Sequence, residues 1–244
     1  PDTGQSKCYS SSGEASCQKD PGQDGAYTTV PMSFRQNDDG TITDLITGLI
    51  WLKDFIKSDK TQADTLASAN RTGGFQDWRV PTIKELYSLI DFSGTTGRAP
   101  PEASRAPKDA RPYLPSIFHF EYPRTNRYID AQYISGTLAR GRIMGGRMPA
   151  FYGVNFADGR IKSYPVSPRN GEKYYLRLVR GNPEYGKNQF KVQPDGTILD
   201  QASGLLWTRY DSGAPQMQKS LKSAKFKDGR LDWREALAFC ENLN

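Results

Sequence analysis

A stretch of sequence that occurs twice constrains this chain more than any other feature. Residues 39–54 read DGTITDLITGLIWLKD, and residues 195–210 read DGTILDQASGLLWTRY. Eight of the sixteen positions are identical at a fixed offset of 156 residues, and Phe34 has its counterpart in Phe190. Because the offset is close to the length of an ordinary domain, the duplication indicates two copies of one folding unit.

Both copies carry the signals of a β-hairpin. An Asp-Gly turn dipeptide at residues 39–40 and 195–196 is followed by a short run of Thr, Ile and Leu, which favours a strand. A second turn with Gly then leads into an apolar run that ends at Trp51 in the first copy and at Trp207 in the second. We therefore expect each copy to begin with a hairpin and each Trp to be a core residue.

Three segments have the pattern of short helices. Thr82 and Glu85 form a capping-box pair at the start of a helix predicted over residues 83–92. Residues 64–70 are rich in Ala, and residues 233–243 show the spacing of an amphipathic helix.

Further strands are predicted by alternating apolar residues and by turn signals. They lie at residues 127–135, 151–156, 160–164 and 174–179, with a hairpin turn at Asp158-Gly159. The chain contains 23 glycines and 16 prolines, yet 11% of its residues are aromatic. This composition is too rich in turns for a helical bundle and too aromatic for disorder, so we predict an α+β fold of twisted antiparallel strands and short helices.

The repeat sets the expected domain boundaries. We predict an N-terminal arm over residues 1–33, a complete domain over residues 34–182, and a partial second copy over residues 183–244. The second copy is predicted to be partial because nothing in it corresponds to the DWRVPTIKEL segment of the first.

The cysteines point to an oxidising compartment. Cys8 and Cys17 lie nine residues apart in a Gly/Ser-rich stretch that burial could hardly order, so we predict a disulfide that contributes about 2 kcal/mol. The competing interpretation, half of a zinc site, fails because the spacing is wrong and no His is near. Cys240 has no evident partner.

The beginning of the chain also favours export. It opens on Pro1 with no Met and no apolar leader, as expected for a mature exported protein, although an arbitrary boundary at Pro1 would look the same. No stretch approaches the roughly 18 apolar residues of a membrane helix, so no membrane span is expected.

Few residues suggest catalysis or metal binding. The only histidine, His119, lies between two Phe residues and suits packing better than acid–base chemistry. Oxygen ligands for calcium could come from residues 37–39 and Asp44, but the spacing is not that of an EF-hand and turn chemistry explains the same residues. The Asp77-Trp78-Arg79 element favours a structural role, with the Trp buried and the Arg paired to a carboxylate. We predict no enzyme activity, no cofactor and no metal.

Basic residues are concentrated in one block. Residues 139–180 contain nine Lys and Arg against two acidic residues, a balance of +7 in a chain whose total is +6. We predict a loop around three arginines and a single positive surface that an anionic partner contacts, because Arg pairs bidentately with sulfate, phosphate and carboxylate. The predicted surface comprises Arg140, Arg142, Arg147, Arg160, Lys162 and Tyr164.

Several partners fit this positive surface. An anionic glycan, an acidic protein surface, or no ligand at all would each be consistent with the charge. Nucleic acid is disfavoured by the expected export.

Five segments give the chain a resemblance to a known family, the Lcl C-terminal domain family. They are DGTITDLITGLIW, GGFQDWRVPTIKELYSLIDFSG, YIDAQYISGT, FYGVNFADGRIKSYP and YYLRLVRGN. The resemblance covers residues 34–182 and resumes at Phe190. It implies an exported protein with a C-type-lectin-like fold, often in tandem copies, and a role in adhesion or glycan contact. The founding member is a collagen-like adhesin that binds sulfated glycosaminoglycans.

The chain departs from this family at three positions. Ile134 stands where members usually carry Trp, and Leu178 stands where they carry Cys. The helical Cys of the family corresponds to Cys240 in the second copy and falls near Ala67 in the first. The resemblance therefore implies that the first copy lost both halves of a disulfide together.

These observations favour a non-catalytic exported binding module, in the periplasm, at the cell surface or outside the cell. The alternative is a structural subunit of an extracellular or periplasmic assembly, as a homo-oligomer or with other chains, in which the arm and the second copy contact neighbouring subunits.

Overall fold

A computed structural model describes residues 2–27, 29–100, 102–124, 127–143, 145–168, 171–221, 225 and 228–243. The chain forms two compact units, each described by itself below. The first combines Pro1–Gly4 with Val30–Tyr185, and the second combines Gln5–Thr29 with Gly186–Asn244. The arm expected over residues 1–33 is thus divided between the units, and most of it belongs with the C-terminal segment.

A four-stranded antiparallel sheet holds the first repeat. Its strand order is β11-β5-β4-β3, with β3 at Phe34–Gln36, β4 at Thr41–Asp44, β5 at Ile50–Leu52 and β11 at Val179–Arg180. The Asp39 carboxylate shapes the first turn by accepting hydrogen bonds from the amide and hydroxyl of Thr41, at 3.0 and 2.6 Å. The predicted hairpin is confirmed.

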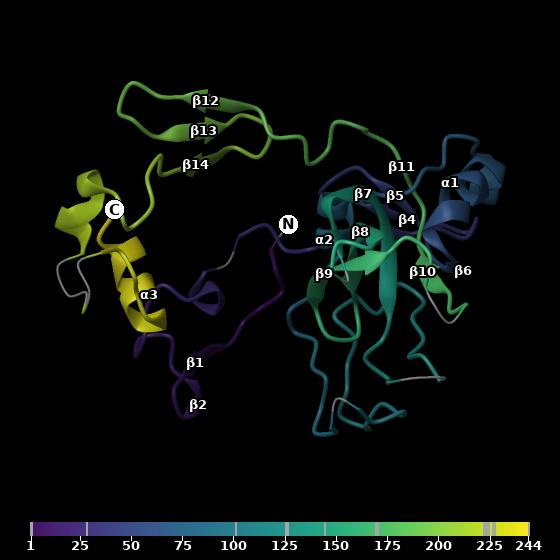
Figure 1. Cartoon of the computed structure of the whole chain (residues 1–244), viewed down its shortest axis with the longest axis horizontal. Helices are drawn as coiled ribbons and strands as arrows, with labels where there is room; N and C mark the ends of the chain where they lie inside the picture. Colours follow the sequence, from purple (N-terminus) through teal and green to yellow (C-terminus); the bar gives the residue numbers. More distant parts are fainter. Residues whose placement is uncertain are drawn as a thin grey trace. The chain divides into compact units, whose positions relative to one another are not determined.

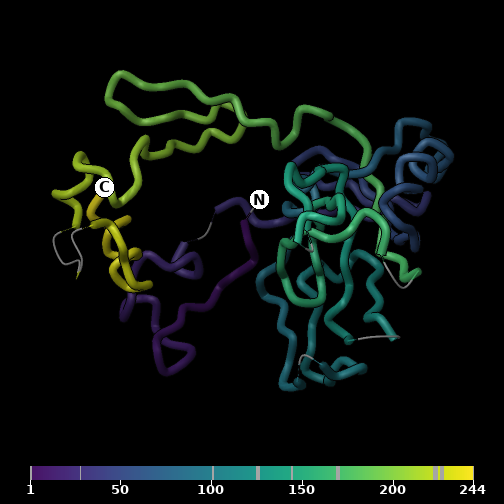
Figure 2. The backbone as a smooth tube through the Cα atoms, viewed as in Figure 1, coloured from purple at the N-terminus to yellow at the C-terminus, as the bar shows by residue number. Residues whose placement is uncertain are grey.

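The larger sheet of the first unit has five strands (Figure 1). Its order is β6-β10-β7-β8-β9, with β6 at Ile56–Ser58, β7 at Gln132–Ile143, β8 at Met148–Asn155, β9 at Arg160–Pro165 and β10 at Tyr174–Leu176. All its pairs are antiparallel except β10 with β7. The described residues between 93 and 131 form no helix or strand and run as irregular loops (Figure 2).

Two short α-helices belong to the described part of this unit. Helix α1 spans Lys60–Ala69, and α2 spans Ile83–Tyr87. The predicted capping box is present at the start of α2, where the hydroxyl of Thr82 accepts from the amide of Glu85 and the Glu85 carboxylate accepts from the amide of Thr82. The helix predicted over residues 83–92 is too long, because regular α-helix ends at Tyr87 and tighter turns follow.

Two buried clusters form the core of the first unit. One contains Trp51 together with Leu86, Leu89, Tyr133 and further residues, and the other contains Trp78 with residues of α1, β7, β8 and β10. Trp51 is fully buried and Trp78 is 4% exposed. Their predicted core positions are confirmed.

The strand predicted over residues 174–179 is interrupted at Arg177 and Leu178 and forms the separate strands β10 and β11. A strand with alternating apolar residues would ordinarily have one buried and one exposed face, and this segment does not. All six side chains from Tyr174 to Val179 are buried, because this segment joins the two sheets and is covered on both sides.

The described part of the second unit contains a three-stranded sheet, a two-stranded sheet and one α-helix. Strands β12, β13 and β14 span Phe190–Val192, Ile198–Asp200 and Leu205–Trp207, and helix α3 spans Trp233–Glu241. Trp207 is 51% exposed, so the prediction that it is a core residue is wrong. The physical reason is that nothing in the described part of this unit packs over the sheet as Leu86, Leu89 and Tyr133 do over Trp51.

The predicted disulfide between Cys8 and Cys17 is present and ties the hairpin of β1 (Cys8–Ser10) and β2 (Gly13–Ala15). This segment contacts α3 within the second unit. Arg234 forms an ion pair with Asp20 at 3.0 Å, and the hydroxyl of Tyr27 donates to Glu241 at 2.7 Å.

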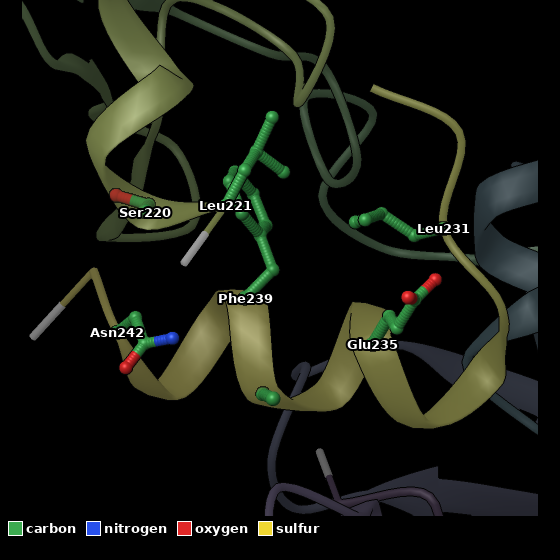
Figure 3. A pocket seen from close by; sticks show the side chains of 7 residues that line it. Ser220, Leu221, Leu231, Glu235, Phe239 and Asn242 are labelled. Atoms are coloured by element: carbon green, nitrogen blue, oxygen red, sulfur yellow. The ribbon is translucent and has the colours of Figure 1, made fainter. Parts of the chain in front are cut away.

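Near α3, Phe239 points toward the buried side chain of Leu221 (Figure 3). The cavity beside these two residues holds only about 10 Å³. Such a volume admits at most a single water molecule, so it is no ligand site.

Candidate ligand surface

Three arginines of the basic block lie on the long β-hairpin formed by β7 and β8. Arg140 and Arg142 belong to the end of β7, opposite the beginning of β8, with Arg142 paired to Pro149. The prediction that they lie on a loop is wrong for these two residues. The glycines around them did suggest a loop, but two irregularities in the β7–β8 register accommodate the segment within the sheet.

The turn of this hairpin carries the third arginine. Gly145 and Gly146 both have positive φ angles, of 69° and 80°, which favour glycine. The amide of Arg147 donates to the carbonyl of Ile143 at 3.1 Å and closes the turn.

The side chains of the three arginines are exposed. Among the described residues, none forms an ion pair with Arg140, Arg142 or Arg147. We call these three residues the arginine tip.

Arg160 and Lys162 do not join the arginine tip. They pair with Asn155 and Gly153, toward the far end of β8, whereas Arg142 pairs with Pro149 at its beginning. From Pro149, Gly153 is four positions and Asn155 six positions further along the strand, which correspond to roughly 13 and 20 Å. The hairpin turn at Asp158-Gly159 exists as predicted, but it places these two residues away from the arginine tip.

The charges of Arg160 and Lys162 are also balanced locally. The buried carboxylate of Asp158 lies 3.3 Å from the Arg160 side chain and 3.9 Å from the Lys162 ammonium. Burial raises the pKa of Asp158, and the two neighbouring cations oppose that shift. The positive electrostatic field that an external anion meets is therefore weaker at this part of the predicted surface than at the arginine tip.

Tyr164 is a packing residue on the inner side of β9. Its ring lies 6.0 Å from that of Phe151 and 6.0 Å from that of Tyr174. Burial raises the pKa of its phenol, and its hydroxyl has no hydrogen-bond partner among the described residues. The ring of Tyr164, predicted to be part of the ligand surface, is thus packed against other rings, whereas Tyr152 on β8 is 41% exposed.

Arg177, one of the nine cations in the charge balance of the block, is fully buried. Its guanidinium donates to the carbonyl oxygens of Leu52, Lys53, Asp54 and His119, with distances of 2.6 Å to Leu52 and His119. Burial lowers the pKa of this side chain. Arg177 therefore fixes two loops to the β10–β11 junction and cannot contact a ligand.

Two more basic residues of the block are engaged in ion pairs. Lys173 pairs with Asp59 at 2.9 Å, and Arg180 pairs with Asp77 at 2.7 Å. The hydrogen bond from Arg180 lowers the pKa of Asp77. Arg169, also part of the block, lies outside the described residues.

The Asp77-Trp78-Arg79 element has the structural role that was expected. Arg79 makes a bidentate ion pair with the buried carboxylate of Glu85, at 2.7 and 2.6 Å, and so supports the capping box of α2. The indole N–H of Trp78 donates to the carbonyl of Thr72 at 3.1 Å.

The expected turn chemistry of Asp44 is also present, since its carboxylate accepts from the amides of Ile46 and Thr47. His119 lies 2.7 Å from Asp54 at the surface. In the described part of the chain, no group of three or more His, Cys, Asp or Glu is arranged to hold a metal ion.

A cleft that the sequence did not reveal lies at the ends of β6, β7 and β10. It encloses about 480 Å³, and Lys57, Glu121, Tyr122 and Tyr174 are among its lining residues. Burial lowers the pKa of Lys57 to about 8, and its ammonium lies 3.0 Å from the ring centroid of Tyr175. Sequence patterns could not identify this cleft because its walls come from four separate segments.

The fold and the charged hairpin first define the class of this protein. It is an α+β domain of mainly antiparallel sheets with exposed arginines on a pair of strands. The chain belongs to the Lcl C-terminal domain family, which it matches over residues 40–180, more than half of its length. The family that the sequence resembled is thus confirmed, and it indicates an adhesin-like surface or extracellular protein.

Curated proteins and solved structures give no match. Within the described residues, no helix is both long and apolar enough to span a bilayer.

Proposed function

We propose that this chain is a non-catalytic, exported binding module whose arginine tip contacts anionic polymers such as sulfated or carboxylated glycans. The observation that carries the proposal is which cations of the basic block are paired, which are buried and which remain exposed. Most of its other described cations are paired with carboxylates or buried, whereas Arg140, Arg142 and Arg147 are exposed and form no ion pair with a described residue.

The chemistry of these side chains fits a polyanion. A guanidinium offers a planar pair of donors that matches the oxygens of sulfate or carboxylate. Three such groups near one turn can contact successive charges of a polymer. Tyr152 supplies an exposed ring on β8 in the same hairpin. Because the contacts are exposed, the affinity should fall steeply with salt.

Two finer features accompany this proposal. The first unit is a C-type-lectin-like domain, supported by the pairing of its early strands β5 and β6 with its last strands β11 and β10. The second unit contains a partial copy of this domain, supported by the repeat. The disulfide between Cys8 and Cys17 supports export to an oxidising compartment.

The test compares two triple variants of the full chain on an immobilised heparin-like polymer. R140S/R142S/R147S removes the arginine tip, and R98S/R105S/R124S removes the same number of exposed charges elsewhere on the first unit. We expect wild type and the second variant to bind in a salt-sensitive manner, and the first variant to lose binding at least tenfold with an unchanged melting temperature. Equal loss in both variants, or no salt-sensitive binding by wild type, would refute the proposal.

A further inference from the structure

Strands β12, β13 and β14 of the second unit repeat strands β3, β4 and β5 of the first. Ile42 pairs with Trp51 in the first unit, and Ile198 pairs with Trp207 in the second. The β3–β4 and β12–β13 pairs also share one register at the offset of 156 residues. Even the first turn is repeated, since Asp195 accepts from the amide and hydroxyl of Thr197.

The two sheets differ in what covers them. Leu49, which directly precedes β5, and Trp51 of β5 are fully buried, whereas their counterparts Leu205 and Trp207 of β14 are 56% and 51% exposed. In the first unit, the outer edge of β5 is paired with β11, with Val179 opposite Trp51. In the described part of the second unit, no strand pairs with the outer edge of β14.

The register shows which amides this open edge presents. In the first unit, the amide of Leu52 donates to the carbonyl of Leu178 in the strand-joining segment, at 3.1 Å. Alternate residues of a strand direct their amides to the same edge. The counterparts of Ile50 and Leu52 are Leu206 and Thr208, so their amides face outward. An exposed edge of this kind is a template for an added strand.

We propose that the outer edge of β14 accepts an antiparallel strand from a partner polypeptide with the chemistry of Leu178–Arg180. The first unit supplies the template for this occupant: an apolar β-branched residue lies opposite the Trp, and a basic residue follows it. A second copy of this chain is a poor donor, because its own Val179 is fully buried between β5 and Arg79. The inference is independent of the arginine tip.

The probe is a fluorescent peptide with the sequence of residues 174–182, YYLRLVRGN, added to the full chain. Fluorescence anisotropy measures binding, and hydrogen exchange measures protection of the amides of Leu206 and Thr208. Two protein variants distinguish the edges of the sheet. L206P removes an outward amide from β14, and V192P removes one from β12 at the opposite edge, where the side chain is equally exposed, 57% against 59%.

Peptides methylated on one backbone nitrogen provide a test without altering the protein. In the first unit, Val179 exchanges both backbone hydrogen bonds with Arg79, so the amide of Arg180 faces β5. Methylation of the backbone nitrogen at the position of Arg180 should weaken peptide binding at least tenfold. Methylation at the position of Val179 should change the affinity by no more than about twofold.

The expected result is saturable binding to wild type and V192P, a loss of at least tenfold in L206P, and protection of the amides of Leu206 and Thr208. Binding that ignores these substitutions, or an absence of peptide binding, overturns the proposal. Self-association of the full chain that L206P abolishes, without peptide binding, also overturns it, because the occupant would then be a second copy.

Discussion

The duplication places a Trp at the same register position in two environments, so its contribution to the free energy of unfolding can be compared between them. Trp51 is fully buried, and a Trp side chain buries about 150–250 Å². At about 25 cal/mol per Å², this area corresponds to about 4–6 kcal/mol of transfer free energy. Its indole N–H is buried without a partner among the described residues, and removing it relieves a cost of about 1–3 kcal/mol. Trp51→Ala should therefore destabilise the first unit by about 3 kcal/mol, the lower end of the usual range.

Trp207→Ala is the matched control, because Trp207 occupies the same register position but is 51% exposed. It should cost about 1 kcal/mol or less. Calorimetry of the full chain should show a fall of roughly 6–12 °C in the melting temperature of the first unit for Trp51→Ala. Equal shifts for the two variants, or no shift for Trp51→Ala, would refute the assignment of their environments.

Three further predictions concern other parts of the chain. Replacing Cys8 and Cys17 by Ser should lower the stability of the second unit by about 2 kcal/mol and leave the first unchanged in calorimetry; a shift in the first unit would contradict the assignment of the arm. Arg177→Lys cannot reach four carbonyl oxygens and should cost at least about 2 kcal/mol in denaturant unfolding, so an unchanged midpoint would refute its anchoring role. Because burial lowers the pKa of Lys57, its neutral amine should appear near pH 8, and trace acylation should half-titrate there rather than near 10.4, the value of an ordinary lysine.

Local features of the fold were predictable because all the residues that determine them lie close together in the sequence. The Asp-Gly turns, the capping box of Thr82 and Glu85, and the short disulfide each depend on residues within about ten positions of one another. The same holds for the hairpin between β8 and β9. Such features form wherever the segment is placed, so pattern and spacing are sufficient.

The errors have a common physical cause, which is that burial depends on segments distant in sequence. Trp51 and Trp207 have the same local sequence and the same pairing, and only the first is covered by α2 and the second sheet. Arg177 belongs to an alternating segment, yet the loops around Leu52 and His119 supply its acceptors from 125 and 58 residues away. No local pattern encodes either outcome.

The basic block shows why a charge count alone could not define the ligand surface. The count treated nine cations as equivalent, but a surface acts on an external anion only through charges that remain exposed and uncompensated. Asp158 compensates two of them at one end of β8, and burial removes Arg177 altogether. A balance of +7 over a segment is therefore compatible with a field that comes mainly from the arginine tip. If so, R160S/K162S should weaken polyanion binding much less than R140S/R142S, although each variant removes two positive charges from one strand of the same sheet.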